Sequence, residues 1–183
     1  MNLTKRLGLS AHDSAADQGE VILLALVVSV MSEVKAQAES LTGSSLKSSP
    51  VIAQKLLAEL PQPAATLQPA QVARIALALI KYAGSPASLS VTEKLFEFCT
   101  PKIKESFGSL PSFLRLLQAS TYAPLHDFQQ VEMQPLFRSD RQAWQSIVVK
   151  SAAGNYHHFV LGLQRMTYGP HENCWLVESL NPE

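Results

Sequence analysis

The fold is decided by three runs near the end of the chain: WQSIVVK (Trp144–Lys150), YHHFVLGLQRMT (Tyr156–Thr167) and NCWLVESL (Asn173–Leu180). Apolar and polar residues alternate along these runs, which is the pattern of strands that bury one face. Short turn segments at Gly154-Asn155 and Tyr168-Gly169-Pro170 separate them, and strands joined by short turns pair as a meander. The runs therefore predict an antiparallel sheet.

A further strand is expected before these three. The segment Phe128–Phe137 has strand-like composition, and Pro135 confines part of it to a sheet edge or a bulge because proline has no N–H to donate. A turn at Ser139-Asp140 leads from it into the next strand, Arg141–Ser151. We therefore expect a sheet of about four strands.

Helical spacing fills the part of the domain that precedes the sheet. Apolar residues recur at helical intervals after Pro69, and Gly84 ends that segment. Two compact helical segments follow, Thr92–Glu105, which Ser90 is expected to cap, and Pro111–Ala119. Helices followed by a meander predict an α+β fold, with helices packed on one face of a curved antiparallel sheet.

The domain is expected to start after a stiff connector, because Pro61-Gln62-Pro63 lies between the helical segments. We predict three parts: an N-terminal helical extension at 1–60, a Pro-rich linker at 61–68 and the α+β domain at 69–183.

The extension contains an apolar run, Val21–Met31, that is broken only by Ser29. Eleven residues of helix rise about 16 Å, about half the hydrocarbon thickness of a bilayer, so no transmembrane span is expected. A helix that is apolar on nearly every side needs burial. Val21–Met31 is therefore expected to pack within the domain, dock on a partner or lie against a membrane surface.

Composition excludes several classes of function. Apolar residues make up 46% of the 183 residues, so a core can form. Lysine plus arginine equals aspartate plus glutamate, 15 each, so bulk charge attracts neither nucleic acid nor an anionic membrane, and self-association meets little repulsion. Acidic residues follow the basic start of the chain, which argues against a secretory signal.

Chemical motifs are sparse. Cys99 and Cys174 are expected to be reduced, buried thiols, and no His/Cys cluster predicts a metal site. Neither a Gly-rich phosphate loop nor a G-x-S-x-G motif is present in the sequence. We therefore predict no catalytic residue, metal or cofactor.

The paired histidines give the most tempting candidate site. Neighbouring residues on a strand point to opposite faces, so His157 and His158 cannot line one pocket. His157 shares its face with Phe159, which is typical of a core, whereas His158 shares the other face with Gln164. Trp144 suits either the wall of a ligand pocket or core packing. The candidate ligand-binding residues are Tyr122, Glu132, Trp144, His158 and Gln164.

The order of segments also resembles a known family. The residues that carry the resemblance are Lys94–Pro101, Phe107-Gly108-Ser109, Phe113, Tyr122-Ala123-Pro124-Leu125, Gly154 and Cys174–Ser179. This set is similar to the domain-of-unknown-function family 4864, over residues 69 to 182. The resemblance implies a nuclear transport factor 2-like cone, the fold of ketosteroid isomerase and the SnoaL-like enzymes. It carries no isomerase residue over, because nothing here matches the acidic base or the Tyr/Asp pair of those enzymes.

Two functions from different classes follow. The favoured one is a non-catalytic interaction or assembly module that binds a protein partner, or itself, through the sheet face or the Val21–Met31 helix. The alternative is a small-molecule-binding protein or isomerase-like enzyme that uses the interior of the cone. Peripheral membrane contact through Val21–Met31 stays open as a weaker alternative. We expect a soluble intracellular protein, and the choice between the cytoplasm and an organelle interior such as the chloroplast stroma stays open.

Overall fold

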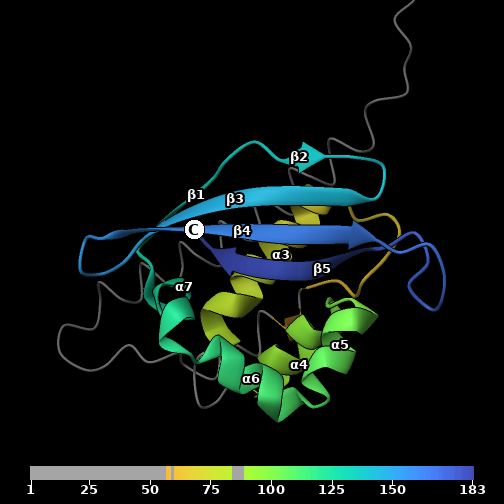
Figure 1. Cartoon of the computed structure of the whole chain (residues 1–183), viewed down its shortest axis with the longest axis horizontal. Coiled ribbons are helices and arrows are strands. Elements are labelled where there is room, and N and C mark those ends of the chain that lie inside the picture. Colours follow the sequence, from red (N-terminus) through yellow and green to blue (C-terminus); the bar gives the residue numbers. More distant parts are fainter. Residues whose placement is uncertain (1–56, 59, 84–88) are drawn as a thin grey trace, which may run out of the picture. The chain divides into compact units, whose positions relative to one another are not determined.

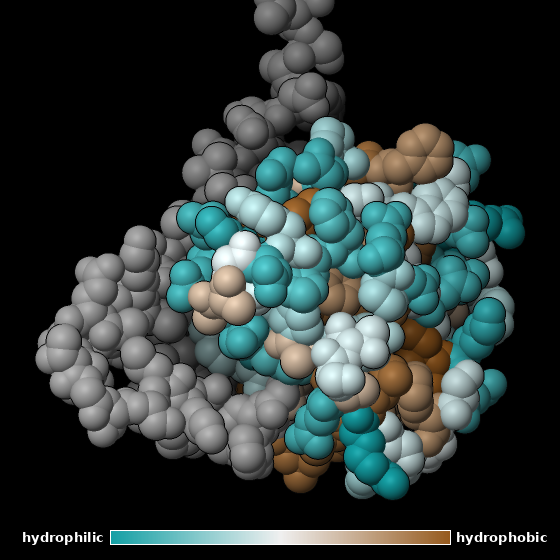
Figure 2. All heavy atoms as spheres, turned by 60° about the vertical axis from the view of Figure 1, so that its left-hand side comes forward, coloured by the Kyte–Doolittle hydropathy of each residue, from teal (hydrophilic) through white to brown (hydrophobic). Residues whose placement is uncertain are grey.

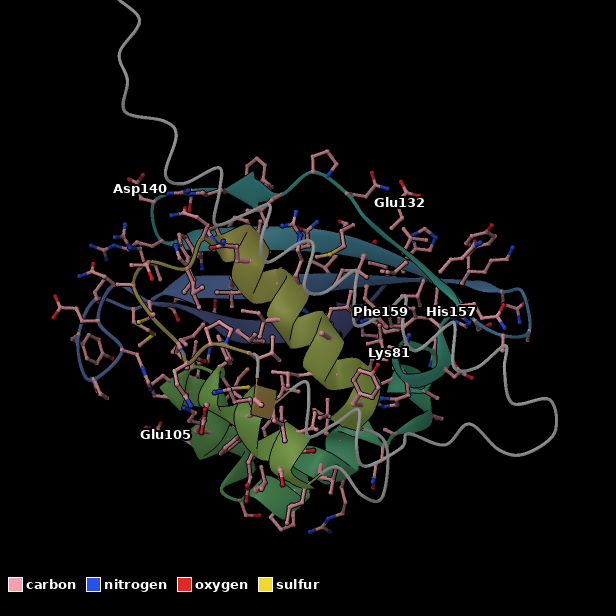
Figure 3. The ribbon with its side chains drawn as sticks, turned by 180° about the vertical axis from the view of Figure 1, so that it is seen from behind. Lys81, Glu105, Glu132, Asp140, His157 and Phe159 are labelled. Carbon is pink, nitrogen blue, oxygen red and sulfur yellow. The ribbon has the colours of Figure 1, made fainter. Side chains whose placement is uncertain are left out.

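Helix α3 (Pro69–Ala83) lies across one face of an antiparallel sheet (Figure 3). The protein is seen in a computed structural model that describes residues 57–58, 60–83 and 89–183, all within one compact unit. The remaining helices of this part lie below the sheet in Figure 1: α4 (Leu89–Glu97), α5 (Pro101–Phe107), α6 (Leu110–Leu117), the 3-10 turn η1 (Ser120–Tyr122) and α7 (Pro124–Asp127). The predicted α+β class is confirmed.

The sheet is an open meander of five strands in the order β1–β3–β4–β5, with β2 also paired to β3. The strands are β1 (Gln130–Met133), β2 (Phe137–Arg138), β3 (Gln142–Lys150), β4 (Tyr156–Arg165) and β5 (Trp175–Pro182). The two hairpin turns expected after β3 and β4 are confirmed, and each contains a glycine at φ 85°, Gly154 and Gly169.

The sequence predicted one strand over Phe128–Phe137, and these bounds are wrong. It is split into β1 and β2, which pair with the same edge of β3 on either side of Pro135. The last ladder contact before the split is the N–H of Gln134, which donates to the carbonyl of Ser146 at 3.0 Å. Pro135 has no N–H and ends the ladder, so the expected edge position of this residue is confirmed.

The predicted helix Thr92–Glu105 was also wrong, because the chain leaves the helix between α4 and α5. The N–H of Val177 on β5 donates to Phe98 O at 2.8 Å, and the N–H of Thr100 donates to Val177 O at 2.9 Å. Thr100 then caps α5, whose first residue is Pro101. Helix α4 begins at Leu89, so Ser90 lies inside it and is not its cap.

The core lies between α3 and the sheet, as predicted. Alternate residues of β4 are fully buried, among them Phe159, Leu161 and Leu163. Ala143, Ile147 and Val149 repeat the pattern on β3. The apolar positions of α3 complete this core: Val72, Ile75, Ala76, Leu79 and Ile80.

None of the helices in the described part of the chain has the length and hydropathy that a bilayer crossing requires. Val21–Met31 lies outside the described residues. The three-part division at 60 and 68 stays a prediction; Leu60, at the boundary, is buried.

Candidate functional site

The face of the sheet opposite α3 carries the most exposed aromatic residues of the strands. No described helix crosses this face, which is turned to the viewer in Figure 1. Phe137 is 69% exposed and Trp144 is 36% exposed, although both lie on paired strands. We call this surface the outer face; its members are Glu132 on β1, Phe137 on β2, Gln142, Trp144, Ser146, Val148 and Lys150 on β3, and Tyr156, His158, Val160, Gly162 and Gln164 on β4.

One end of the outer face is an aromatic pair. Phe137 and Trp144 are directly opposite each other across β2 and β3, with ring centroids 5.7 Å apart and planes inclined by 41°. On the other side of Trp144 the directly opposite residue is Gly162, which has no side chain. A Cβ at Gly162 would lie 2.4 Å from Ser179 Oγ, so a larger residue there would require the Ser179 side chain to rotate away. The indole therefore lacks a cross-strand side chain on its β4 side.

The other end of the outer face mixes charged and aromatic residues. Lys150 and Tyr156 are directly opposite each other, and the Lys150 Nζ lies 5.5 Å from the centroid of the Tyr156 ring. These two residues, together with Glu132 and Val148, line a shallow hollow at the edge of β1. The Glu132 carboxylate accepts a hydrogen bond from Gln134 Nε2 at 2.7 Å, and Figure 3 shows Glu132 at the margin of the sheet.

Four of the five predicted ligand-binding residues lie on the outer face, but not at one point. Glu132 and His158 both flank Val148, so their strands are about 10 Å apart. Gln164 lies six residues along β4 from His158, which is about 20 Å. The structure therefore spreads Glu132, Trp144, His158 and Gln164 over the sheet and brings none of them into a pocket with Tyr122.

Tyr122 lies on the opposite side of the sheet, at a partly open apolar cavity of about 200 Å³. Its hydroxyl donates to the carbonyl of Leu180 at 3.1 Å, and its ring stacks on Phe159 with centroids 6.4 Å apart. The cavity lies between β5 and the helices, and its apolar lining includes Ile80, Leu95, Ile103, Phe113, Leu116 and Leu117. In Figure 2, apolar side chains gather low on the right of the molecule, and polar side chains cover most of the remaining visible surface.

Few polar groups reach this cavity. They come from Cys99, Tyr122, Glu178, Ser179 and Asn181. Sequence reasoning identified only Tyr122 among them. The others were missed because they meet only through the contact between the Phe98–Thr100 segment and β5, which no local pattern signals.

The Cys99 thiol is buried in the wall of the cavity, in surroundings that make it poorly reactive. Its Sγ lies 3.4 Å from the carbonyl of Leu95, to which it donates. Burial raises the pKa of Cys99 to about 12, against a smaller opposing effect of the positive charge of Lys104. A thiol that stays protonated at neutral pH is a poor nucleophile. Burial also raises the pKa of Cys174, which packs with Met166 and Leu176.

His126 has a structural position that the sequence did not reveal. Its Nδ1 lies 2.8 Å from the carbonyl oxygen of Ile80 and its Nε2 lies 2.7 Å from that of Leu117. The ring therefore links α7 to α3 and α6. Asp127, its neighbour, is the last residue of α7.

In the part of the chain that the structure describes, no group of three or more His, Cys, Asp or Glu side chains could hold a metal ion. Comparisons with protein families, with curated proteins and with solved structures found no match.

Proposed function

We propose that this chain contains a nuclear transport factor 2-like domain of the family 4864 kind, and that it acts as a non-catalytic assembly module. The occupant of its outer face is a second copy of the same chain. The observation that carries the proposal is the Phe137–Trp144 pair, two large rings that stay exposed on paired strands. The order of helices followed by an antiparallel meander supports the fold assignment.

The energetics favour covering these rings. A large aromatic side chain buries about 150–250 Å², and apolar burial contributes about 25 cal/mol per Å². Phe137 and Trp144 retain part of that area in water, so an interface centred on them would gain apolar burial.

Charge is consistent with self-pairing. A twofold interface brings the same patch of two subunits together, so the patch has to complement itself. The outer face carries both Glu132 and Lys150, and a twofold arrangement can oppose the acidic side chain of one subunit with the basic side chain of the other. The chain has no formal net charge, so two copies do not repel each other at long range.

The test is the molar mass of the full chain in solution, measured by light scattering over a concentration series. We expect a dimer, and we expect Phe137→Asp to weaken it by about tenfold or more because a carboxylate would be buried at the interface. Tyr168→Asp is the matched control, because Tyr168 is similarly exposed, at 74%, but lies in the β4–β5 turn. A monomer at all concentrations, or equal weakening by both variants, would refute the second copy as the occupant.

The apolar cavity beside Tyr122 favours a second candidate function, the binding of a small apolar molecule. Enclosed apolar cavities of about 150 Å³ in other proteins take up benzene, and this partly open cavity measures about 200 Å³. Its volume suits a ligand with a single ring, whose one polar group could reach Tyr122 or Asn181.

This second candidate is tested by titrating the full chain with toluene and following methyl resonances by NMR. We expect saturable shifts in the wild type and their loss in Leu116→Trp, which fills the cavity. Leu114→Trp is the control, because Leu114 is half-buried on the same helix but does not line the cavity. Unchanged binding in Leu116→Trp would eliminate this site.

A further inference from the structure

A second pocket, at the end of the sheet near α5, is lined by three cationic side chains. Lys102 comes from α5, Arg141 from the turn before β3 and Arg165 from the last residue of β4. The pocket has a volume of about 120 Å³, and the hydroxyl-bearing residues Thr100, Thr167 and Tyr168 also line it. We call it the cationic pocket.

Two of its three cations come from chain segments that the backbone holds together. The N–H of Arg165 donates to the carbonyl oxygen of Arg141 at 2.8 Å, which fixes the end of β4 against the turn before β3. Lys102 follows Pro101, the first residue of α5, and Thr100 is paired with β5. Backbone hydrogen bonds therefore position the segments that bear the three charges, and no ligand is needed to bring these segments together.

One hydrogen-bond donor of the Arg165 side chain lacks an acceptor in the described part of the chain. Its Nε is buried and has no hydrogen-bond partner among the described residues. A buried donor without an acceptor is unfavourable, and a guanidinium group commonly pairs with an oxyanion. The described residues provide no acceptor for Nε, and the Arg165 side chain lines the pocket, so its guanidinium group is available to pair with an oxyanion of a ligand.

Among the residues that the structure describes, no carboxylate lines the cationic pocket. Asp140 precedes Arg141 in the sequence and Glu105 lies on α5, and Figure 3 shows both at this end of the molecule. Neither belongs to the lining. Among the lining residues, positive charge is therefore not offset by negative charge.

We propose that the cationic pocket binds the phosphate group of a small molecule. Guanidinium groups match the geometry of phosphate oxygens, and a lysine adds a mobile point charge. Three cations suit a dianionic phosphate better than a singly charged carboxylate. The volume accommodates the phosphate group alone, and any remainder of the ligand would extend past the exposed ring of Tyr168.

The experiment is a calorimetric titration of the full chain with inorganic phosphate, against sodium chloride of equal ionic strength. We expect one saturable site for phosphate and none for chloride. Arg165→Gln and Arg141→Gln should each weaken binding by about tenfold or more, because each removes a charge-assisted hydrogen bond. Arg115→Gln is the matched control, because Arg115 is exposed on α6 and lies outside the pocket.

A second arm uses glycerol 3-phosphate. Tighter binding than that of inorganic phosphate would support a phosphate ester as the ligand, and equal binding would support free phosphate. If Arg165→Gln does not fold, the exposed residues Arg141 and Lys102 carry the test through their glutamine variants. The proposal is overturned if no saturable binding occurs, or if Arg115→Gln weakens binding as much as Arg141→Gln does.

Discussion

Phe137 and Trp144 lie opposite each other across β2 and β3, with ring centroids 5.7 Å apart, yet both remain exposed. The second tryptophan, Trp175, is only 4% exposed and packs near Arg138. The two indoles of this protein therefore report on different environments, one at the outer face and one in the core.

This difference predicts how the fluorescence responds to a water-soluble quencher. Trp144→Phe should remove most of the emission that acrylamide quenches, whereas Trp175→Phe should leave it. If a second copy covers the outer face, quenching of the Trp175→Phe variant should fall as protein concentration rises. If the quenching does not change with concentration in a sample shown to be dimeric, the dimer interface does not include the outer face.

The contacts of His126 predict a loss of stability when the ring is removed. His126→Ala removes the ring contacts to the carbonyl oxygens of Ile80 and Leu117. Both oxygens lie in partly buried surroundings and lose the imidazole as their partner. We expect the free energy of unfolding to fall by about 2 kcal/mol, measured by urea denaturation. His158→Ala is the control, because His158 is exposed on the outer face, and it should change stability by less than about 0.5 kcal/mol. Equal losses would contradict a structural role for His126.

The raised pKa of Cys99 predicts alkaline sensitivity. The folded value is about 12 and the ordinary value is 9.0, so the folded state holds this proton more tightly than the unfolded state. The corresponding stability is complete below pH 9 and is lost as pH rises from 9 towards 12, at up to about 1.4 kcal/mol per pH unit. Burial raises the pKa of Tyr82 as well, which adds a loss of the same sign above pH 10.

The measurement is unfolding free energy against pH for the wild type and Cys99→Ala. The alanine variant should be less stable at pH 7 because it leaves a cavity, but its stability should fall less between pH 9 and pH 11. A thiol reagent should also leave Cys99 unmodified at pH 8 until urea unfolds the chain. Parallel pH profiles would mean that Cys99 ionises normally in the folded state.

Much of the sheet could be predicted from the sequence, because its signals are local. The alternation of Phe159, Leu161 and Leu163 identified the buried face of β4, and the glycines of the turns marked its ends. On β3 the pattern is less clear, because Gln145 occupies a buried position at 3% exposure. Its amide donates to the backbone carbonyl of Gln134, a contact that depends on how the chain bends at Pro135.

The candidate site was harder to predict, because its position depends on contacts between distant segments. Trp144 suited either a pocket wall or the core, and only the placement of α3 on the other face decides that it is exposed. Tyr122 lines a cavity because β5 lies beside it, 58 residues later in the chain. The cationic pocket combines residues from α5, β4 and a turn, and no spacing in the sequence indicates that convergence.

The break between α4 and α5 gives a last prediction, about capping. Thr100 Oγ1 accepts a hydrogen bond from the N–H of Ile103 at 3.5 Å and so caps α5. Thr100→Val keeps the shape and the branched Cβ but removes this acceptor at a residue that is buried. We expect a loss of about 1–2 kcal/mol in the free energy of unfolding.

Ser109 provides the matched control for Thr100. It occupies the same position at the start of α6, but its side chain makes no capping hydrogen bond and instead pairs with the Ser112 hydroxyl, at 3.0 Å. Ser109→Ala should therefore cost only a few tenths of a kcal/mol on the scale of surface substitutions. If the two variants lose the same stability by urea denaturation, the Thr100 hydroxyl does not hold the start of α5, and the contact of Phe98 and Thr100 with Val177 alone would account for the break.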